Sequence, residues 1–305
     1  MKLSVPAYYK SFKCIADRCR HSCCVGWEID IDSVTMKKYR TLSDGYGKNI
    51  LESIEGDEPH FRLCEDERCT HLDERGLCRI ISCFGDEYLC HICRAHPRFY
   101  NDTVRGKEAG LGLSCEEAAR IILSRDDYDK MIGIDEFCPQ DEWECPDTDF
   151  DAAVHRERIY SILSADAPYP KRLSYICDEF KVSPAALPGE EWCEVLSSLE
   201  YLNEEHRRLF FCYSSDLETP EKAEDYLRRA LSYFVYRHCS GAGSEEKFRI
   251  SLGFSLFCER LLSSMVREYK ADTFEKICEL ARVISEEIEY SEDNTESIKD
   301  IFYFV

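Results

Sequence analysis

The residues best suited to chemistry are cysteines near the start of the chain. Four of them fall within eleven positions, with the last two adjacent: Cys14, Cys19, Cys23 and Cys24. A disulfide between adjacent cysteines would strain the intervening peptide, so such a pair more often wraps one centre or points to different partners. Thiols clustered this closely, in a sequence without an export signal, predict a bound metal or iron–sulfur cluster rather than a disulfide framework.

Five further cysteines extend the cluster at short spacings. A turn at Gly76 can fold Cys78 back toward Cys69. Cys90 and Cys93 form a C-x-x-C pair, which is close enough for both sulfurs to bind one ion. We therefore predict nine metal ligands: Cys14, Cys19, Cys23, Cys24, Cys69, Cys78, Cys90, Cys93 and Cys115.

The sequence leaves the identity and number of the centres open. Zinc takes four thiolate or imidazole ligands in a tetrahedron, and a 4Fe–4S cluster also takes four thiolates. Because thiolates are already in excess, we expect nearby histidines to lie at the surface or behind the ligands: His21, His71, His91 and His96. The C-x3-C-x2-C motif of radical S-adenosylmethionine enzymes is absent, since Gly26 stands at its third position.

Composition restricts the class of protein. The chain has 305 residues, enough for one large or two ordinary domains, and a net charge of −21. Nucleic-acid binding depends on Lys and Arg to neutralise phosphates, so this charge argues against it. The charge is compatible with a cationic partner, such as a lysine-bearing protein surface, or with a role in solubility alone.

Cysteine usage and hydropathy predict a cellular compartment. The 19 cysteines are an odd number, so complete internal pairing is impossible. The first ten residues contain no apolar run typical of a signal peptide, and no stretch approaches the roughly 20 apolar residues of a membrane span. We expect a cytoplasmic protein with no membrane segment, and the sequence leaves its oligomeric state open.

Short elements are expected to position the cysteines. Residues 27–32 alternate apolar and acidic side chains, which is typical of a short strand. Asp32 or Ser33 can then cap a short helix. Ser114 and Glu117 match a capping box, which predicts that Cys115 lies in the first turn of a helix. The helix dipole would favour its thiolate there.

The second half of the chain has helical periodicity. Residues 126–150 are acidic and contain two prolines, which predicts an exposed linker. Helices are expected around 153–165, 190–212, 220–238, 245–270 and 273–288. Six well-separated cysteines are expected to be small core residues: Cys177, Cys193, Cys212, Cys239, Cys258 and Cys278. No glycine-rich motif follows a strand, which argues against a Rossmann-type domain.

These patterns predict a mainly α protein. A cysteine-rich, metal- or cluster-binding N-terminal domain with little strand would occupy residues 1–145, and a helical C-terminal domain would occupy residues 146–305.

The motifs of residues 10–125 resemble those of the flagellin lysine-N-methylase family, within the broader CxxCxxCC group of zinc- or iron-chelating proteins. They are C-x4-C-x3-C-C-x-G-W from Cys14, G-L-C-R-I from Gly76, G-D-E-Y-L-C-x-x-C-R from Gly85 and L-S-C-E-E-A-A-R from Leu113. His96 and Glu116 depart from the family, which more often has an aromatic residue and a proline at these positions. Neither change removes a cysteine.

The resemblance implies transfer of a methyl group from S-adenosylmethionine to lysine ε-amines of flagellin, dependent on a cysteine-bound 4Fe–4S cluster or zinc. It assigns neither a general base nor a donor site in this chain. Two other hypotheses stay open at this point. The chain could be a non-catalytic zinc- or iron-chelating module, or a metal-dependent redox or other enzyme with an unrelated substrate site in its C-terminal helices.

Overall fold

The chain forms two units, which we name the helical unit and the cysteine unit. The computed structural model describes residues 2–26, 29–42, 45–65, 67–136 and 145–303. The helical unit comprises residues 1–12, 98–136 and 142–305, and the cysteine unit comprises residues 13–97 and 137–141. The helical unit is therefore discontinuous in sequence, and each unit has its own hydrophobic core.

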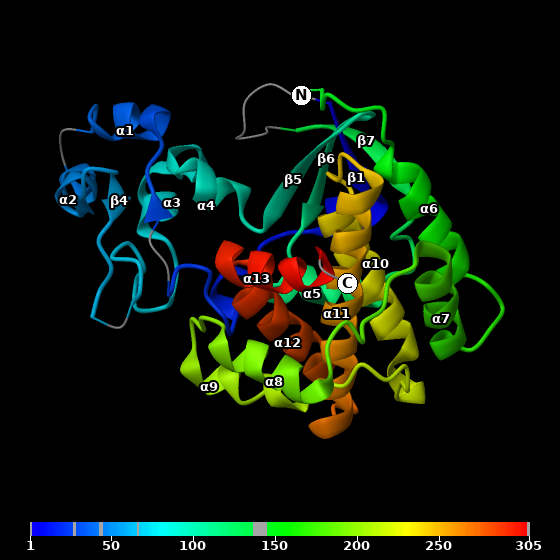
Figure 1. Cartoon of the computed structure of the whole chain (residues 1–305). Coiled ribbons are helices and arrows are strands. Elements are labelled where there is room, and N and C mark those ends of the chain that lie inside the picture. Colours follow the sequence, from blue (N-terminus) through cyan, green and yellow to red (C-terminus); the bar gives the residue numbers. More distant parts are fainter. Residues whose placement is uncertain (1, 27–28, 43–44, 66, 137–144, 304–305) are drawn as a thin grey trace. The chain divides into compact units, whose positions relative to one another are not determined.

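A mixed four-stranded sheet lies within the helical unit (Figure 1). Its order is β5-β6-β1-β7, and its strands are β1 (Lys2–Pro6), β5 (Arg98–Thr103), β6 (Gly106–Leu111) and β7 (Met131–Asp135). β1 is parallel to β6, with Ser4 opposite Glu108, and antiparallel to β7, with Lys2 opposite Asp135. β5 and β6 form an antiparallel hairpin.

This sheet corrects the predicted fold class. A cysteine-rich N-terminal domain with little strand, followed by helices, is wrong because the first strand and residues 98–135 build a sheet inside the helical unit. The predicted acidic linker also contains β7. Its acidic neighbours suggested an exposed loop, whereas Ile134 is buried and the whole strand pairs with β1 at the distant start of the chain.

The described residues of the helical unit form the helices that the sequence predicted and two, at residues 169–180 and 292–303, that it did not predict. They are α5 (Glu116–Ser124), α6 (Ala152–Leu163), α7 (Tyr169–Phe180), α8 (Gly189–Ser198), α9 (Glu204–Arg207), α10 (Glu224–Cys239), α11 (Glu245–Glu268), α12 (Phe274–Ile284) and α13 (Glu292–Tyr303). α12 begins where a helix start was predicted, and Thr273 caps it. The expected helix over 190–212 is broken into α8, α9 and a 3-10 turn at Phe210–Cys212.

α11 is the central element of this unit's core. Every residue from Ser251 to Val266 is buried, as expected for a helix surrounded by other elements. Gly253 lies against α13, where an added Cβ would come within 2.4 Å of Phe302 Cδ1. A residue without a side chain therefore allows the close approach of these two helices.

A π-helix at Ser285–Glu289 follows α12 directly. It carries two carboxylates into the protein interior, since the side chains of Glu287 and Glu289 are both 0% exposed. Buried carboxylates need hydrogen-bonding or charged partners. Glu289 Oε1 lies 2.6 Å from His238 Nε2, and Glu289 Oε2 accepts a hydrogen bond from Tyr233. This irregular turn thus joins α10 to the end of α12.

The cysteine unit is built from short elements. Its sheet has the order β2-β4-β3, with strands Ile29–Asp30, His60–Phe61 and Ile54–Glu55. Its helices are α1 (Ser33–Tyr39), α2 (Tyr46–Glu52), α3 (Arg79–Phe84) and α4 (His91–Ala95), with 3-10 turns at Ala16–Arg18 and Asp86–Tyr88. The predicted helix start is confirmed, because Asp32 accepts hydrogen bonds from Val34 N and Thr35 N. Trp27 and Glu28 of the predicted strand lie outside the described residues.

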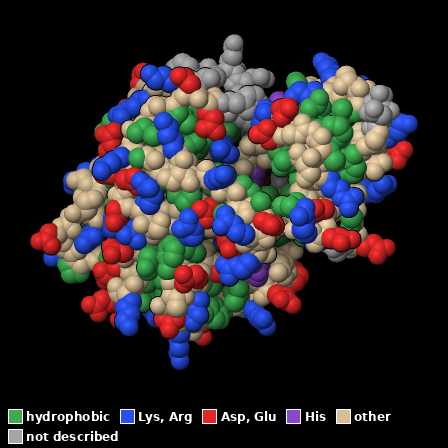
Figure 2. Space-filling view, turned by 180° about the vertical axis from the view of Figure 1, so that it is seen from behind, with side chains coloured by type: hydrophobic (Ala, Val, Ile, Leu, Met, Phe, Trp, Pro, Cys, Tyr) green, Lys and Arg blue, Asp and Glu red, His purple; other side chains and the backbone are tan. Residues whose placement is uncertain are grey.

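The surface carries both signs of charge. On the face drawn in Figure 2, basic side chains are interspersed with acidic ones. Among the helices within the described ranges, none is both long and apolar enough to cross a membrane.

Candidate metal centre

Six of the nine predicted ligands gather in the cysteine unit. Cys69 and Cys90 are buried in its hydrophobic core, and three more cysteines pack against that core: Cys24, Cys78 and Cys93. The sixth, Cys23, shares a hydrogen bond with Cys24. The fold therefore brings together thiols from widely separated segments of sequence.

Backbone hydrogen bonds align the adjacent cysteine pair with the second cysteine segment. Cys69 N donates to the Cys24 carbonyl at 2.8 Å, and Gly26 N donates to the Glu67 carbonyl at 3.0 Å. These bonds place the main chain of Cys24 directly beside that of Cys69.

The predicted turn at Gly76 is confirmed. Gly76 has a φ of 74°, a left-handed conformation that glycine adopts without steric cost. Asp73 Oδ1 closes the turn by accepting hydrogen bonds from Arg75 N and Leu77 N, each at 2.9 Å. The chain then returns along itself, so that Cys78 pairs in an isolated bridge with Leu72.

The C-x-x-C pair lies at the start of α4. Cys90 is the N-cap residue and Cys93 lies in the first turn, where the two thiols hydrogen-bond to each other. Asp32 Oδ2 accepts a hydrogen bond from His91 N at 2.9 Å, so the residue that caps α1 also holds the beginning of α4. Tyr39 Oη lies 3.5 Å from Cys90 Sγ.

Proton sharing within each pair makes the two thiols unequal. The hydrogen bond with Cys24 lowers the pKa of Cys23 to about 7, and the same bond raises the pKa of Cys24. In the second pair, the hydrogen bond with Cys93 lowers the pKa of Cys90, and the pKa of Cys93 is raised. A bound cation would replace the shared protons, because metal ligands must be deprotonated.

The pairs also influence one another electrostatically. The hydrogen bond with Cys23 and burial raise the pKa of Cys24 most. The negative charges of Cys69 and Cys78 raise it further. Burial raises the pKa of Cys69 to about 11, with further contributions from Cys78 and Cys90. A bound metal cation would offset this mutual repulsion between thiolates.

The donor set suits zinc and an iron–sulfur cluster alike, because each is bound by four thiolates.

Three predicted ligands lie outside this gathering. Cys14 is exposed, and its sulfur accepts a hydrogen bond from Ala16 N. Cys19 Sγ donates to the His21 carbonyl at 3.1 Å. Cys115 belongs to the helical unit.

The predicted capping box at Cys115 is wrong. Cys115 itself is the N-cap of α5, with extended backbone angles, and so precedes the first turn. Ser114 Oγ is buried with no hydrogen-bond partner, so it caps nothing. The helix begins one residue later than the local pattern suggested.

His71 has a structural role, in line with the sequence analysis. The two ring nitrogens of His71 lie 2.8 Å from Tyr46 Oη and 2.9 Å from Ser53 Oγ. Burial lowers the pKa of His71 to about 4, so the ring is neutral at pH 7. With both nitrogens engaged, His71 supports the fold and is not a metal ligand.

The sequence analysis missed two side chains that contact the segment carrying the C-x-x-C pair. Tyr39 approaches Cys90, and Asp32 binds the start of α4. Neither residue belongs to a motif spacing, and only the packing of α1 reveals them. Of the six cysteines expected in the helical core, Cys239 and Cys258 are fully buried and the other four are partly exposed: Cys177, Cys193, Cys212 and Cys278.

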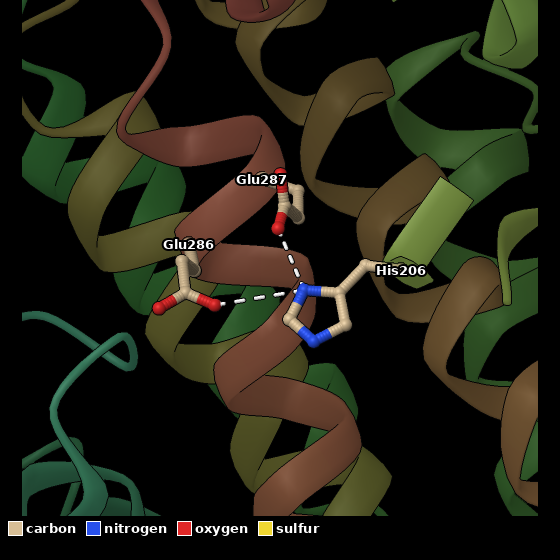
Figure 3. A group of neighbouring side chains, drawn as sticks. All are labelled: His206, Glu286 and Glu287. Atoms are coloured by element: carbon tan, nitrogen blue, oxygen red, sulfur yellow. Dashed lines mark hydrogen bonds and ion pairs between the residues drawn. The ribbon is translucent and has the colours of Figure 1, made fainter. Parts of the chain in front are cut away.

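A second group of metal-type donors lies in the helical unit (Figure 3). His206 Nδ1 is 2.6 Å from Glu287 Oε1 and 3.7 Å from Glu286 Oε2. Glu287 Oε2 also accepts a hydrogen bond from Leu202 N, and Glu286 Oε1 pairs with Arg282 at 2.8 Å. These partners satisfy the carboxylates without an ion, so the group joins α9 to the π-helix as an ion-pair network.

Five buried or half-buried thiols and the exposed Cys23, in a small, loop-rich unit, are typical of cysteine-cluster proteins. Comparison with known proteins gives relatives whose names specify an activity. The chain is 30% identical over 130 residues to the lysine-N-methylases of Salmonella typhimurium and Salmonella choleraesuis, a match covering 40% of this chain and 32% of each relative. It is 29% identical over 130 residues to the flagellar biosynthetic protein FliU of Salmonella muenchen, covering 77% of that protein.

The predicted resemblance to the flagellin lysine-N-methylase family is confirmed by these relatives. The match spans only about a third of the length of the lysine-N-methylases. No family model matches the chain, and no solved structure matches it.

Proposed function

We propose that the chain is a protein lysine N-methyltransferase that uses S-adenosylmethionine as the methyl donor. The observation that carries this proposal is the 30% identity over 130 residues to two proteins named lysine-N-methylase. The relative named flagellar biosynthetic protein supports a lysine-bearing flagellar protein, flagellin, as the substrate. A net charge of −21 would favour encounter with a cationic, lysine-rich surface.

The cysteine unit would hold the centre on which the activity depends. Its ligands would be four of the six gathered thiols: Cys23, Cys24, Cys69, Cys78, Cys90 and Cys93. The donor set fits a 4Fe–4S cluster or zinc. Such a cluster supplies electron transfer or a Lewis-acidic iron, whereas zinc would supply a structural cross-link.

Methyl transfer to lysine sets clear demands on the protein. The ε-amine must lose its proton before it can attack the methyl group that the donor sulfonium carries. The amine nitrogen, the methyl carbon and the sulfonium must also be held in line, which is mainly a matter of positioning. Acidic and aromatic side chains suit both the cationic lysine and the sulfonium.

The test starts from protein purified without oxygen. Iron, zinc and acid-labile sulfide are measured, and the same sample is assayed for transfer of labelled methyl groups to flagellin lysines. We expect Cys78→Ser and Cys90→Ser to lose both the centre and methyl transfer. The matched control is Cys83→Ser, since Cys83 is an exposed cysteine of the same unit outside the predicted ligand set. Metal-loaded protein that transfers no methyl group to lysine would reject the methyltransferase.

A non-catalytic chelating module is the second candidate. It is favoured by the separate hydrophobic core of the cysteine unit, within which the thiols gather. The wild-type module would retain its metal, whereas Cys78→Ser and Cys90→Ser would lose it. Methyl transfer would be absent from every sample.

A further inference from the structure

We propose that Tyr39 is a positioning residue for the metal centre, whose hydroxyl donates a hydrogen bond to the Cys90 sulfur when that sulfur is a ligand. This inference rests on the cysteine-bound centre proposed above. It concerns how tightly the centre is held and, for an iron–sulfur cluster, its reduction potential.

The packing of Tyr39 fixes its hydroxyl against the cysteine. Tyr39 is the last residue of α1 and is 0% exposed, and Cys90 is 1% exposed. The ring packs against Phe61, with the two ring centroids 6.0 Å apart. The Tyr39 hydroxyl donates to the Tyr88 carbonyl at 2.7 Å and lies 3.5 Å from Cys90 Sγ.

A second contact holds the end of α1 in the same place. Lys38 Nζ donates a hydrogen bond to the Glu87 carbonyl at 2.9 Å, next to the residue that Tyr39 contacts. Two consecutive side chains of α1 thus bind two consecutive carbonyls of the turn that leads to Cys90. The hydroxyl therefore stays near the sulfur while it rotates about its own C–O bond.

The single hydroxyl hydrogen has two possible acceptors. A Cys90 thiol has its own hydrogen and can donate to Tyr39 Oη, which leaves the hydroxyl free to donate to the Tyr88 carbonyl. A ligand sulfur has no hydrogen and can only accept. The hydroxyl then gains a better, negatively charged acceptor, and hydrogen bonds to charged groups are stronger than neutral ones.

Hydrogen bonds of this kind have known effects on metal centres. Partners of the ligands contribute about 10- to 100-fold to metal affinity. Hydrogen bonds to cluster sulfurs also tune reduction potential, because they stabilise the more negative, reduced state. Tyr39 is thus expected to raise both the affinity and the potential.

The test compares Tyr39→Phe with Tyr46→Phe. Tyr46 is a matched control because its hydroxyl contacts His71 in the same unit. Metal retention is measured by competition with a chelator, and an iron–sulfur centre is also titrated potentiometrically without oxygen. We expect Tyr39→Phe to bind its metal about tenfold more weakly. Its one-electron potential would fall by about 59 mV for each tenfold by which the reduced cluster is destabilised more than the oxidised one. Tyr46→Phe should resemble the wild type.

A second substitution at the same position keeps the test informative if Tyr39→Phe misfolds. Replacement of Tyr39 by 3,5-difluorotyrosine keeps the ring and makes the hydroxyl a stronger donor, so the potential and affinity should shift opposite to those of Tyr39→Phe. Unchanged values in both Tyr39 variants, or equal changes in Tyr39→Phe and Tyr46→Phe, would overturn the inference while leaving the centre in place. Wild-type protein without metal on these cysteines would overturn the inference together with the proposed centre.

Discussion

The two buried carboxylates of the π-helix, Glu287 and Glu289, are each paired with a histidine, and the pair at Glu289 has a defined protonation state. Burial lowers the pKa of His238 to about 4, although the hydrogen bond to Glu289 opposes this shift. Burial would raise the pKa of Glu289, but Arg237 and His238 outweigh it and lower that pKa to about 2. At neutral pH a neutral His238 therefore donates to an ionised Glu289.

This pair predicts a loss of stability in mild acid. The pKa of His238 is lower in the folded state than the ordinary value of 6.5, so the unfolded chain binds the proton first. The free energy of unfolding should fall as pH drops from 6.5 toward 4, by at most about 1.4 kcal/mol per pH unit. Denaturant titrations at pH 7 and pH 5 measure this. His238→Gln keeps a donor to Glu289 and should weaken the dependence, leaving the part that the buried, neutral His71 contributes.

Glu289 adds a second window at lower pH. Its folded pKa of about 2 lies below the ordinary value of 4.5, so its contribution is lost as pH falls from 4.5 toward 2. A stability that stayed constant between pH 7 and pH 5 in the wild type would show that His238 is not buried in its neutral form.

At the scale of the elements, Asp32 holds two helices of the cysteine unit. It caps α1 and accepts a hydrogen bond from His91 N at the start of α4. Loss of a cap costs about 1 kcal/mol, and Asp32→Ala also releases the C-x-x-C turn. We expect lower stability together with faster loss of metal to a chelator.

Thr273→Ala is the control for this prediction. Thr273 caps α12 through Lys276 N in the helical unit, so its loss should cost a similar free energy of unfolding. Metal retention should not change. Equal metal loss in both variants would mean that Asp32 acts through overall stability alone.

The contact between α11 and α13 gives a second prediction at this scale. Gly253→Ala places a Cβ against Phe302, and overpacking costs about 1 to 3 kcal/mol. The higher helix propensity of Ala returns about 1 kcal/mol, so we expect a modest net loss. Gly189→Ala in α8 is the control, because an added Cβ there meets no atom within 4 Å. Thermal unfolding of both variants measures these changes in stability.

Local chemistry made some elements predictable and left others hidden. The cap at Asp32, the start of α12 and the turn at Gly76 depend on neighbouring residues, and the sequence predicted all three. The sheet of β1, β5, β6 and β7 depends on pairing between distant segments, for which short strands carry no local signal.

The same distinction applies to the site. Residue type and spacing selected the cysteines, and six of the nine gather as a group. The packing of α1 against the turn at Asp86–Tyr88 determines which thiols meet and brings Tyr39 close to one of them. No pattern within α1 itself distinguishes this tyrosine from an ordinary core residue.

At the scale of the whole molecule, the two units should respond differently to metal removal. Binding energy at a structural metal site is folding energy for a small unit, whereas the helical unit has its own extensive core. After chelation, we expect amide hydrogens of residues 13–97 to lose protection from exchange, while those of residues 145–303 keep it. Hydrogen exchange with mass spectrometry measures both regions at once. A uniform loss of protection would contradict this prediction.

The pairing of β1 has a consequence for the growing chain on the ribosome. The strand is made first, but its neighbours β6 and β7 follow only after the whole cysteine segment. At a synthesis rate of about 5 to 20 residues per second, the strand waits roughly 5 to 25 seconds for partners. The cysteines emerge during this interval, so for the proposed metal centre the supply of metal to the nascent chain would determine whether the segment is already closed when the sheet forms.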